Sequence, residues 1–376
     1  MKSFDELLLS EILANIGNQY SDNFDFYRFG SKPKTKTTWK SKLKVRLKKK
    51  LGVNNINLDI ERYHSSLEQL SPYLDGIRNI YLNLADDNSK LLLVQLLAYR
   101  ILGEEKYKLP LSTPAYWRGV EEIDRIKDIN DFICVPFVGD SLIKLYKFNL
   151  KSLNIPIEIY YDAGSVYHQV RIKQYEYISD LITIKPDPGD IVLDCGSCWG
   201  DTALFFSNEV EREGHIYSFE FIPNNIETFN RNVNLNPHLK DRITLIANPL
   251  GETSEQELCY TENGPGSKII LDKNDGSIKV KTISIDDFIL RYNLKKIDYI
   301  KMDIEGAELP ALKGGIKTIQ KFKPKLAISI YHSLDDFIKI PEYLHSLDLG
   351  YRFYLNHGTI HLEETVLMAI SNRNCL

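Results

Sequence analysis

The sequence has little cysteine, no long hydrophobic run and no large excess of one charge. Its five cysteines are odd in number and irregularly spaced, which argues against a disulfide framework and favours the reducing cytoplasm. Cys195 and Cys198 form a C-x-x-C pair, but no second pair accompanies them, so no zinc or redox site is predicted. No run of ~18 apolar residues is present to span a membrane, and the first residues lack the apolar core of a signal peptide. The net charge of −4 gives no general attraction to nucleic acid, so no such partner is expected.

The most informative stretch lies between residues 191 and 202. An apolar run from Ile191 to Leu193 predicts a buried parallel strand, and Gly196 and Gly200 predict a tight turn into a helix. The next predicted strand ends in Glu220, where a carboxylate can accept hydrogen bonds from ribose hydroxyls. This arrangement is typical of the nucleotide-binding corner of an open α/β sheet.

The glycine spacing distinguishes between cofactors. A dinucleotide site has the pattern Gly-x-Gly-x-x-Gly, whereas Gly196 and Gly200 are separated by three residues and preceded by Asp194. An acid beside the turn repels a pyrophosphate but suits the ammonium and sulfonium groups of S-adenosylmethionine. A nicotinamide-dependent oxidoreductase therefore fits poorly and is kept as an alternative.

Three motifs resemble those of the FkbM-type S-adenosylmethionine-dependent methyltransferases. They lie at residues 194–202, 218–223 and 301–308, and the last, Lys-Met-Asp-Ile-Glu-Gly-Ala-Glu, is the most specific. The likeness extends from about residue 137 to residue 370. It implies a class I methyltransferase fold, which is a Rossmann-like, doubly wound α/β sheet with an antiparallel last strand. It also implies methyl transfer, usually to a hydroxyl of a sugar, polyketide or other secondary metabolite.

The sequence predicts two domains, a mainly helical one at 1–135 and the methyltransferase domain at 136–376. Helices are expected at 4–17 and over 55–105, and residues 106–136 are interpreted as a linker. The N-terminal domain contains no catalytic constellation. We interpret it as an acceptor-binding or oligomer-forming cap, which leaves a homo-oligomer open.

Strands and helices alternate in the second domain, which predicts a parallel sheet. Residues 252–283 interrupt the alternation and are predicted to form a hairpin insertion. A helix is expected at 175–184 and another at 306–320, and the final two strands at 351–355 and 365–370.

A basic segment at residues 31–50 contains ten Lys or Arg and no acid. Trp39, Leu43 and Leu47 recur at helical spacing, so a helix there would carry an apolar stripe between lysines. The pattern is typical of contact with an anionic membrane or a phosphorylated partner, and equally of a surface helix packed on its own domain. The first interpretation predicts peripheral association with the inner face of the membrane.

Ligands of such sheets bind outside the carboxyl ends of the strands, which ranks the polar residues. By the resemblance, the methionine part of the cofactor lies at the glycine turn, the ribose at Glu220 and the adenine between Phe221 and Ile222. The candidate cofactor-binding residues are Asp194, Gly196, Trp199, Gly200, Asp201, Thr202, Glu220, Phe221 and Asn248.

An alcohol is a weak nucleophile at neutral pH, so its methylation needs a general base or a cation. The candidate catalytic residues are His332, Asp303 and Glu305, with Glu308 and His357 as candidate substrate-binding residues. The histidine is a base candidate because it titrates near neutral pH. The same side chains offer ligands to a magnesium-like ion, but spacing alone does not establish a site, so no metal is assigned and the need for a divalent ion is left open.

These observations predict an S-adenosylmethionine-dependent O-methyltransferase. The expected acceptor is a sugar or glycan precursor, such as a nucleotide-activated sugar used for capsular or other surface polysaccharide. A methyltransferase of another small metabolite or of nucleic acid is the alternative, although no Asn-Pro-Pro-Tyr-like element for a flipped base follows a strand.

Overall fold

The computed structural model describes five stretches of the chain, residues 3–29, 56–137, 141–261, 268–270 and 278–371. They form two compact units. The first comprises residues 1–82, 90–113 and 359–362, and the second comprises 83–89, 114–358 and 363–376. The units separate at residue 113, and the predicted domain boundary at 135 stays a prediction. The basic segment 31–50 lies outside the described residues.

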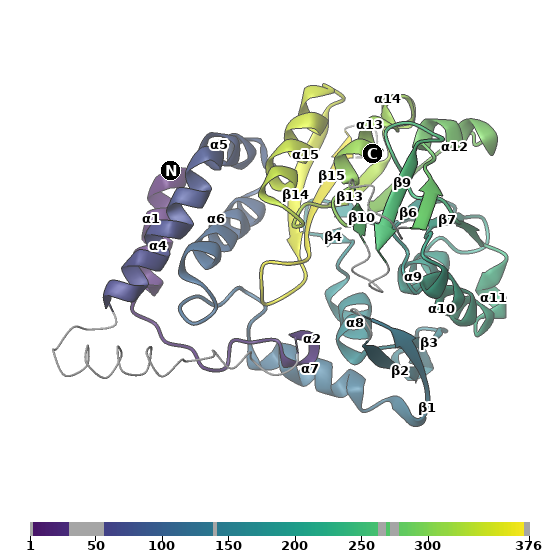
Figure 1. Cartoon of the computed structure of the whole chain (residues 1–376), viewed down its shortest axis with the longest axis horizontal. Helices are drawn as coiled ribbons and strands as arrows, with labels where there is room; N and C mark the ends of the chain where they lie inside the picture. The colour runs from purple at the N-terminus through teal and green to yellow at the C-terminus, as the bar shows by residue number, and fades with distance from the viewer. Residues whose placement is uncertain (1–2, 30–55, 138–140, 262–267, 271–277, 372–376) are drawn as a thin grey trace. The chain divides into compact units, whose positions relative to one another are not determined.

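The first unit is built mainly from helices, as the sequence predicts. They are α1 (Phe4–Asn15), α2 (Phe26–Phe29), α4 (Ile56–Leu70), α5 (Leu74–Asn83) and α6 (Asp87–Leu102), with a 3₁₀ turn at Ser71–Tyr73 that contains Pro72 (Figure 1). A capping box starts α1, because Ser3 and Glu6 each accept the other's backbone N–H. Among the described residues, no helix is both long and apolar enough to cross a bilayer.

The second unit is organised around a seven-stranded sheet with the order β14-β15-β13-β12-β6-β7-β8. Its strands are β6 (Ile191–Cys195), β7 (His215–Phe219), β8 (Ile243–Ile246), β12 (Tyr299–Met302), β13 (Lys325–Ser329), β14 (Tyr351–His357) and β15 (Thr365–Ser371). The strands from β13 to β8 are parallel, and β15 pairs antiparallel with both β13 and β14. The predicted fold class is therefore confirmed.

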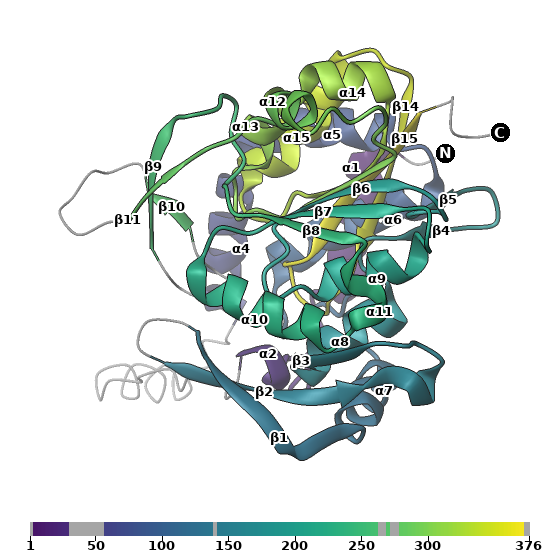
Figure 2. The same ribbon diagram turned by 90° about the vertical axis from the view of Figure 1, so that its right-hand side faces the viewer.

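Helices cover both faces of this sheet (Figure 2). One face carries α9 (Asp201–Glu209), α10 (Pro223–Asn234) and α11 (Pro237–Lys240), and the other carries α12 (Ile285–Arg291), α13 (Glu308–Lys313), α14 (Ile316–Phe322) and α15 (Leu334–Ser346). Every residue of β12, β13 and β15 is buried, as a strand between two helical layers requires.

Smaller sheets flank the central one in sequence. The predicted insertion forms β9 (Glu257–Thr261), β10 (Lys268–Ile270) and β11 (Ile278–Lys281), which pair antiparallel in the order β10-β9-β11. Before the central sheet, β1 (Lys127–Pro136), β2 (Leu142–Asn149) and β3 (Glu158–Tyr161) form an antiparallel sheet, followed by α8 (Ala163–Tyr167) and a π-helical turn at His168–Ile172. The insertion prediction is confirmed.

The predicted linker at 106–136 is wrong in its second half. Residues Pro114–Asp124 form α7, and β1 follows it directly. The prolines misled the prediction because each occupies a position that tolerates it. Pro114 is the first residue of the helix, and Pro136 ends a strand at the edge of its sheet.

The helices predicted at 175–184 and 306–320 also differ from the structure. The first stretch contains two short strands, β4 (Tyr177–Ile178) and β5 (Thr183–Ile184), around a turn in which the Ser179 hydroxyl accepts the N–H of Ile182. The second is divided into α13 and α14. At the break, a Cβ on Gly314 would lie 2.2 Å from the carbonyl oxygen of Gly251, so the close packing of the two segments requires glycine.

Candidate active site

Backbone hydrogen bonds close the turn between β6 and α9. The N–H groups of Gly196 and Ser197 both donate to the carbonyl oxygen of Phe219 at the end of β7. Gly196 has a φ of 84°, and a Cβ there would lie 1.8 Å from the carbonyl oxygen of Asp303. A side chain at this position would therefore separate the two strand ends that form the site.

Asp194 lies in the core beneath this turn. It has no exposed surface, and its carboxylate accepts hydrogen bonds from the hydroxyls of Thr202 at 2.9 Å and Ser218 at 3.2 Å. The ammonium of Lys301 lies 3.4 Å away and donates to the carbonyl oxygen of Gly196 at 2.5 Å. The predicted contact of Asp194 and Thr202 with a ligand is not supported by this arrangement, because both side chains face the core and brace the turn.

Three other predicted cofactor residues, Trp199, Gly200 and Asp201, also support the turn. The Trp199 ring is buried and donates its N–H to Asn225 at 3.1 Å. Gly200 precedes α9 with a φ of 86° and makes room for the Phe229 ring. Asp201 accepts a hydrogen bond from a glutamine amide, and burial raises its pKa to about 6.

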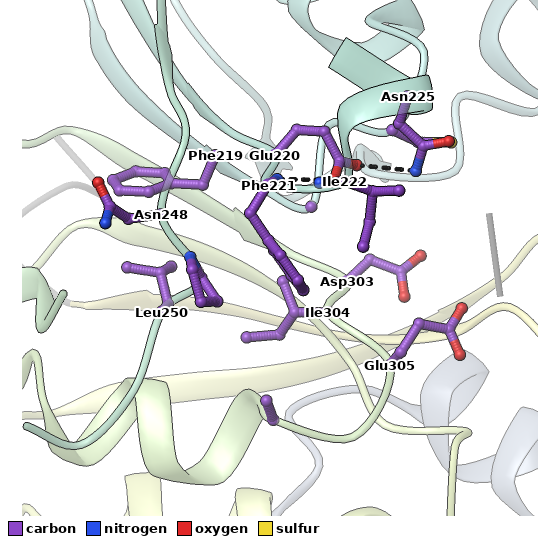
Figure 3. Close-up of a pocket in the computed structure, with 14 residues that line it drawn as sticks. Phe219, Glu220, Phe221, Ile222, Asn225, Asn248, Leu250, Asp303, Ile304 and Glu305 are labelled. Carbon is purple, nitrogen blue, oxygen red and sulfur yellow. Dashed lines mark hydrogen bonds between the residues drawn. The ribbon is translucent and has the colours of Figure 1, made fainter. Parts of the chain in front are cut away.

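A pocket opens at the carboxyl ends of β6, β7 and β12 (Figure 3). It contains six of the predicted residues and Ile222, together with residues that the sequence did not suggest. The lining residues are Gly196, Cys198, Phe219, Glu220, Phe221, Ile222, Asn225, Asn248, Pro249, Leu250, Asp303, Ile304, Glu305 and Ala307. Lys and Arg are absent from this described lining, and three of its residues are carboxylates.

Glu220 follows the last residue of β7. One carboxylate oxygen accepts the backbone N–H groups of Phe221 and Ile222 at 2.7 and 2.8 Å, and the other accepts the Asn225 amide at 3.3 Å. Burial raises the pKa of Glu220 to about 7, against these hydrogen bonds and the charge of Lys301. Asn225 was not predicted, since an asparagine in the first turn of a helix carries no distinctive signal.

One wall of the pocket contains apolar groups. The Phe221 ring packs edge-on against Tyr260 with 5.1 Å between centroids, and Leu250 completes this part of the lining. Asn248 also lines the pocket and donates its amide to the carbonyl oxygen of Lys281 at 3.1 Å. In Figure 3 the carboxylates of Asp303 and Glu305 point away from this apolar wall.

Asp303, Glu308 and His332 form a carboxylate–histidine cluster beyond the end of β12. The His332 Nε2 lies 3.0 Å from Asp303 Oδ1 and 3.2 Å from Glu308 Oε1. The hydroxyls of Tyr175 and Tyr331 donate to Asp303 at 2.8 and 3.3 Å. The three predicted residues are thus brought together, and the two tyrosines are additions from the structure.

The electrostatics of the cluster differ from the expectation for a free histidine. Burial by itself lowers the pKa of His332, but its hydrogen bonds and charge interactions with Asp303 and Glu308 raise it to about 11. Burial by itself raises the pKa of Asp303, but the hydrogen bond and charge of His332 hold it well below its usual range. These contacts therefore favour the protonated form of His332, against the expectation that its pKa lies near neutral pH.

The remaining two predicted residues are Glu305, which lies between Asp303 and Glu308 in the chain, and His357, which lies beyond His332. Glu305 has a φ of 58°, precedes Gly306 in a tight turn and lines the pocket, and its carboxylate lies 3.8 Å from His332 Nδ1. His357 is buried at the end of β14, where its Nδ1 lies 2.9 Å from the Thr365 hydroxyl oxygen. It does not line the pocket, so its predicted contact with a substrate is not supported.

Comparison with known proteins identifies a family for this domain. Residues 194–353 match the model of the methyltransferase FkbM domain. The chain is 25% identical over 164 residues to "Methyltransferase 1" of Beauveria bassiana, which covers 37% of this chain and 64% of that protein. It is 28% identical over 168 residues to the 2-O-methyltransferase NoeI of Sinorhizobium fredii, which covers 40% of this chain and 66% of that protein. The chain thus spans just under two thirds of the length of these relatives.

A solved structure shares the fold. The methyltransferase FkbM of Methylobacillus flagellatus superposes with a TM-score of 0.50 at 20% sequence identity. The match covers 80% of this chain and 60% of that one. At this identity the likeness establishes the fold alone.

Proposed function

We propose that this chain, whose residues 194–353 match the methyltransferase FkbM domain, transfers a methyl group from S-adenosylmethionine to a hydroxyl. The observation that carries the proposal is the position of the pocket. In the sheet, β6 lies between β7 and β12. After β6 the chain adds β7 and β8 on one side of it, and only later adds β12 and β13 on the other side. Ligands of open α/β sheets bind at such a switch point, and the ends of all three strands line this pocket.

The pocket fits S-adenosylmethionine by its charge and its shape. Glu220 presents a carboxylate oxygen with spare acceptor capacity to a ribose, and Phe221 and Leu250 offer apolar surface to an adenine. Three carboxylates in a described lining without Lys or Arg favour a cationic ligand and disfavour the pyrophosphate of a nicotinamide dinucleotide. When bound, the cofactor supplies an electrophilic methyl group on a sulfonium, so the protein has to align the acceptor and accept its proton.

Glu305 is the best-placed proton acceptor in this arrangement. Its carboxylate lines the pocket and is 29% exposed, against 15% for that of Asp303, so an acceptor hydroxyl reaches it more readily. The acceptor oxygen forms a bond to the methyl carbon as the carbon–sulfur bond breaks, and the hydroxyl proton passes to Glu305. We retain Asp303 and His332 in the proposal as groups that orient the acceptor.

The acceptor class in this proposal is a sugar. NoeI is by its name a 2-O-methyltransferase, which supports a hydroxyl as the methylated group. A nucleotide-activated or otherwise phosphorylated sugar for surface polysaccharide is the specific form that we propose, since the basic segment 31–50 would attract phosphate. Another small metabolite with a hydroxyl is the second candidate.

The decisive experiment combines a binding and a turnover measurement. We expect S-adenosylhomocysteine to bind in calorimetry, and one nucleotide-sugar of a panel to gain the mass of one methyl group when it is incubated with S-adenosylmethionine and the protein. Glu220→Gln should weaken S-adenosylhomocysteine binding by roughly 1–3 kcal/mol, the cost of losing hydrogen bonds to a charged group.

The matched control is Glu227→Gln, which changes the same charge at an exposed position of α10 and should leave binding unchanged. Tight binding of NAD without binding of S-adenosylhomocysteine would refute the cofactor. Methylation of a non-sugar hydroxyl alone would refute the acceptor class and keep the reaction type.

A further inference from the structure

We propose that Asp303, Glu308 and His332 bind a divalent first-row metal ion such as Mn²⁺ at the edge of the pocket. One ligand atom from each residue can be chosen so that all three lie within 4.8 Å of one another. The three side chains are 15%, 0% and 5% exposed, so the site is enclosed by protein. Asp303 is also part of the pocket lining, which places the cluster beside the ligand.

The distances in the cluster match a coordination sphere. Two ligands at right angles around a small divalent cation, each about 2.1 Å from it, lie about 3 Å apart. His332 Nε2 lies 3.0 Å from Asp303 Oδ1 and 3.2 Å from Glu308 Oε1. An ion can therefore be placed between the nitrogen and the two oxygens with only small movements of the side chains.

An unsatisfied buried atom gives independent support. Glu308 is completely buried, and its Oε2 has no hydrogen-bond partner among the described residues. A carboxylate oxygen without a partner in the interior is costly and requires an explanation. An ion bound by the Glu308 carboxylate provides that explanation, whereas a purely structural role for Glu308 leaves the atom unpaired.

The surroundings of the cluster orient its ligands in the way that metal sites require. Tyr175 and Tyr331 donate to the Asp303 carboxylate, and the backbone N–H of Ile304 donates to Glu308 Oε1 at 2.8 Å. Hydrogen bonds of this kind fix ligating carboxylates in position. When His332 gives up its proton to bind an ion, the two carboxylates and the neutral imidazole carry two negative charges, which a divalent ion neutralises.

The ligand set selects the type of metal. Oxygen ligands alone suit Mg²⁺ or Ca²⁺, whereas an imidazole nitrogen with carboxylates suits first-row transition metals. Three protein ligands leave coordination positions for other groups. The next step rests on the proposed function. We infer that the acceptor hydroxyl takes one of these positions, where the ion lowers the pKa of the hydroxyl and holds its oxygen in place.

The test measures Mn²⁺ binding directly, without cofactor or acceptor. The full chain is stripped with EDTA, desalted and titrated with Mn²⁺, and free Mn²⁺ is followed by electron paramagnetic resonance. We expect one ion per chain and pulsed spectra that show coupling to a nitrogen of a histidine ring. Glu308→Gln, which keeps the shape of the side chain, should weaken binding at least about tenfold. Glu342→Gln removes an exposed carboxylate of α15 and is the matched control that should not change it.

The wild-type spectrum tests the metal site even if a variant fails to fold. Absence of Mn²⁺ binding at millimolar concentration, or bound Mn²⁺ without nitrogen coupling, would overturn the site. Unchanged affinity in folded Glu308→Gln would overturn it as well. Methyl transfer at full rate in EDTA would refute the role of the ion and leave the proposed function intact. Specific Mn²⁺ binding without methylation of any sugar would refute the proposed acceptor and leave the metal site intact.

Discussion

At the scale of single residues, the site depends on carboxylates that are held in very different surroundings. Asp194 is paired with Lys301 and receives two hydroxyl hydrogen bonds, so it serves the structure of the turn. Glu220 accepts hydrogen bonds from uncharged donors, namely two backbone N–H groups and an amide. It lies at the pocket wall with 8% of its surface exposed. Because burial raises the pKa of Glu220 to about 7, its charge carries a free-energy cost that a ligand can relieve.

This cost gives a pH-dependent stability that Glu220→Gln should remove. The folded state binds the Glu220 proton more tightly than the unfolded state between pH ~4.5 and ~7, so the free energy of unfolding falls as the pH rises through that window. From pH 5 to pH 8 the ligand-free wild type should lose up to roughly 3 kcal/mol relative to Glu220→Gln. Urea unfolding of both proteins at the two pH values measures the difference, with Glu227→Gln as the control for a lost surface charge. Parallel stability profiles of wild type and Glu220→Gln would contradict the prediction.

At the scale of secondary-structure elements, a buried ion pair between adjacent strands stabilises the turn between β6 and α9. Lys301 of β12 lies opposite Asp194 of β6 in the parallel register, and its ammonium also reaches the carbonyl oxygen of Gly196. Burial by itself lowers the pKa of Lys301, but the charges of Asp194 and other nearby acids raise it above its ordinary value, so the side chain is charged. A lysine within an otherwise apolar strand was a visible signal that sequence reasoning missed.

We expect Lys301→Met to destabilise the fold by roughly 3–5 kcal/mol, because it leaves the Asp194 charge buried without its cation. The double variant Lys301→Met/Asp194→Asn should cost clearly less than the sum of the single changes, which a double-mutant cycle in urea would show. Lys279→Met is the control, since its ion pair with Glu257 is exposed and typically contributes less than about 1 kcal/mol. Additive single effects would mean that the pair does not act as a unit.

The sequence predicted the elements better than the orientation of their polar residues. Apolar runs between glycines are sufficient to predict β6, β7, β12 and the switch between them. Whether an acid belongs to the core or to the pocket depends on its position relative to the end of its strand, and a shift of two residues decides it. Asp194 is still within β6, whereas Asp303 directly follows Met302, the last residue of β12. No local pattern in the sequence marks that difference, so both acids were expected to contact the ligand.

Long-range packing explains the other misplaced residues. Trp199 and Asp201 are polar at their tips and close to the glycine turn, so a sequence places them at the ligand. Their partners Asn225 and Gln169 come from segments well separated along the chain, and these contacts hold the two side chains in the framework of the turn. Tyr175 reaches Asp303 in the same way, over a separation that no motif spans.

At the scale of the whole molecule, the candidate site is contained in the second compact unit. All fourteen residues that line the pocket and the three residues of the carboxylate–histidine cluster belong to it. The first unit is therefore not needed to complete this described constellation. Its proposed roles are acceptor binding, oligomer formation and, through residues 31–50, contact with a membrane.

The last prediction concerns this basic segment, for which the sequence supports two interpretations. With ten Lys or Arg and no acid, residues 31–50 should bind vesicles that contain anionic lipid, at about 1 kcal/mol for each basic residue near the surface, and release them in high salt. Replacing the ten basic residues by Gln should abolish sedimentation with anionic vesicles while neutral vesicles serve as the control. Replacing Leu43 and Leu47 by Ser tests the apolar stripe separately. If instead the segment packs on its own domain, the Leu→Ser variant should lose thermal stability, and wild type and the Gln variant should sediment equally.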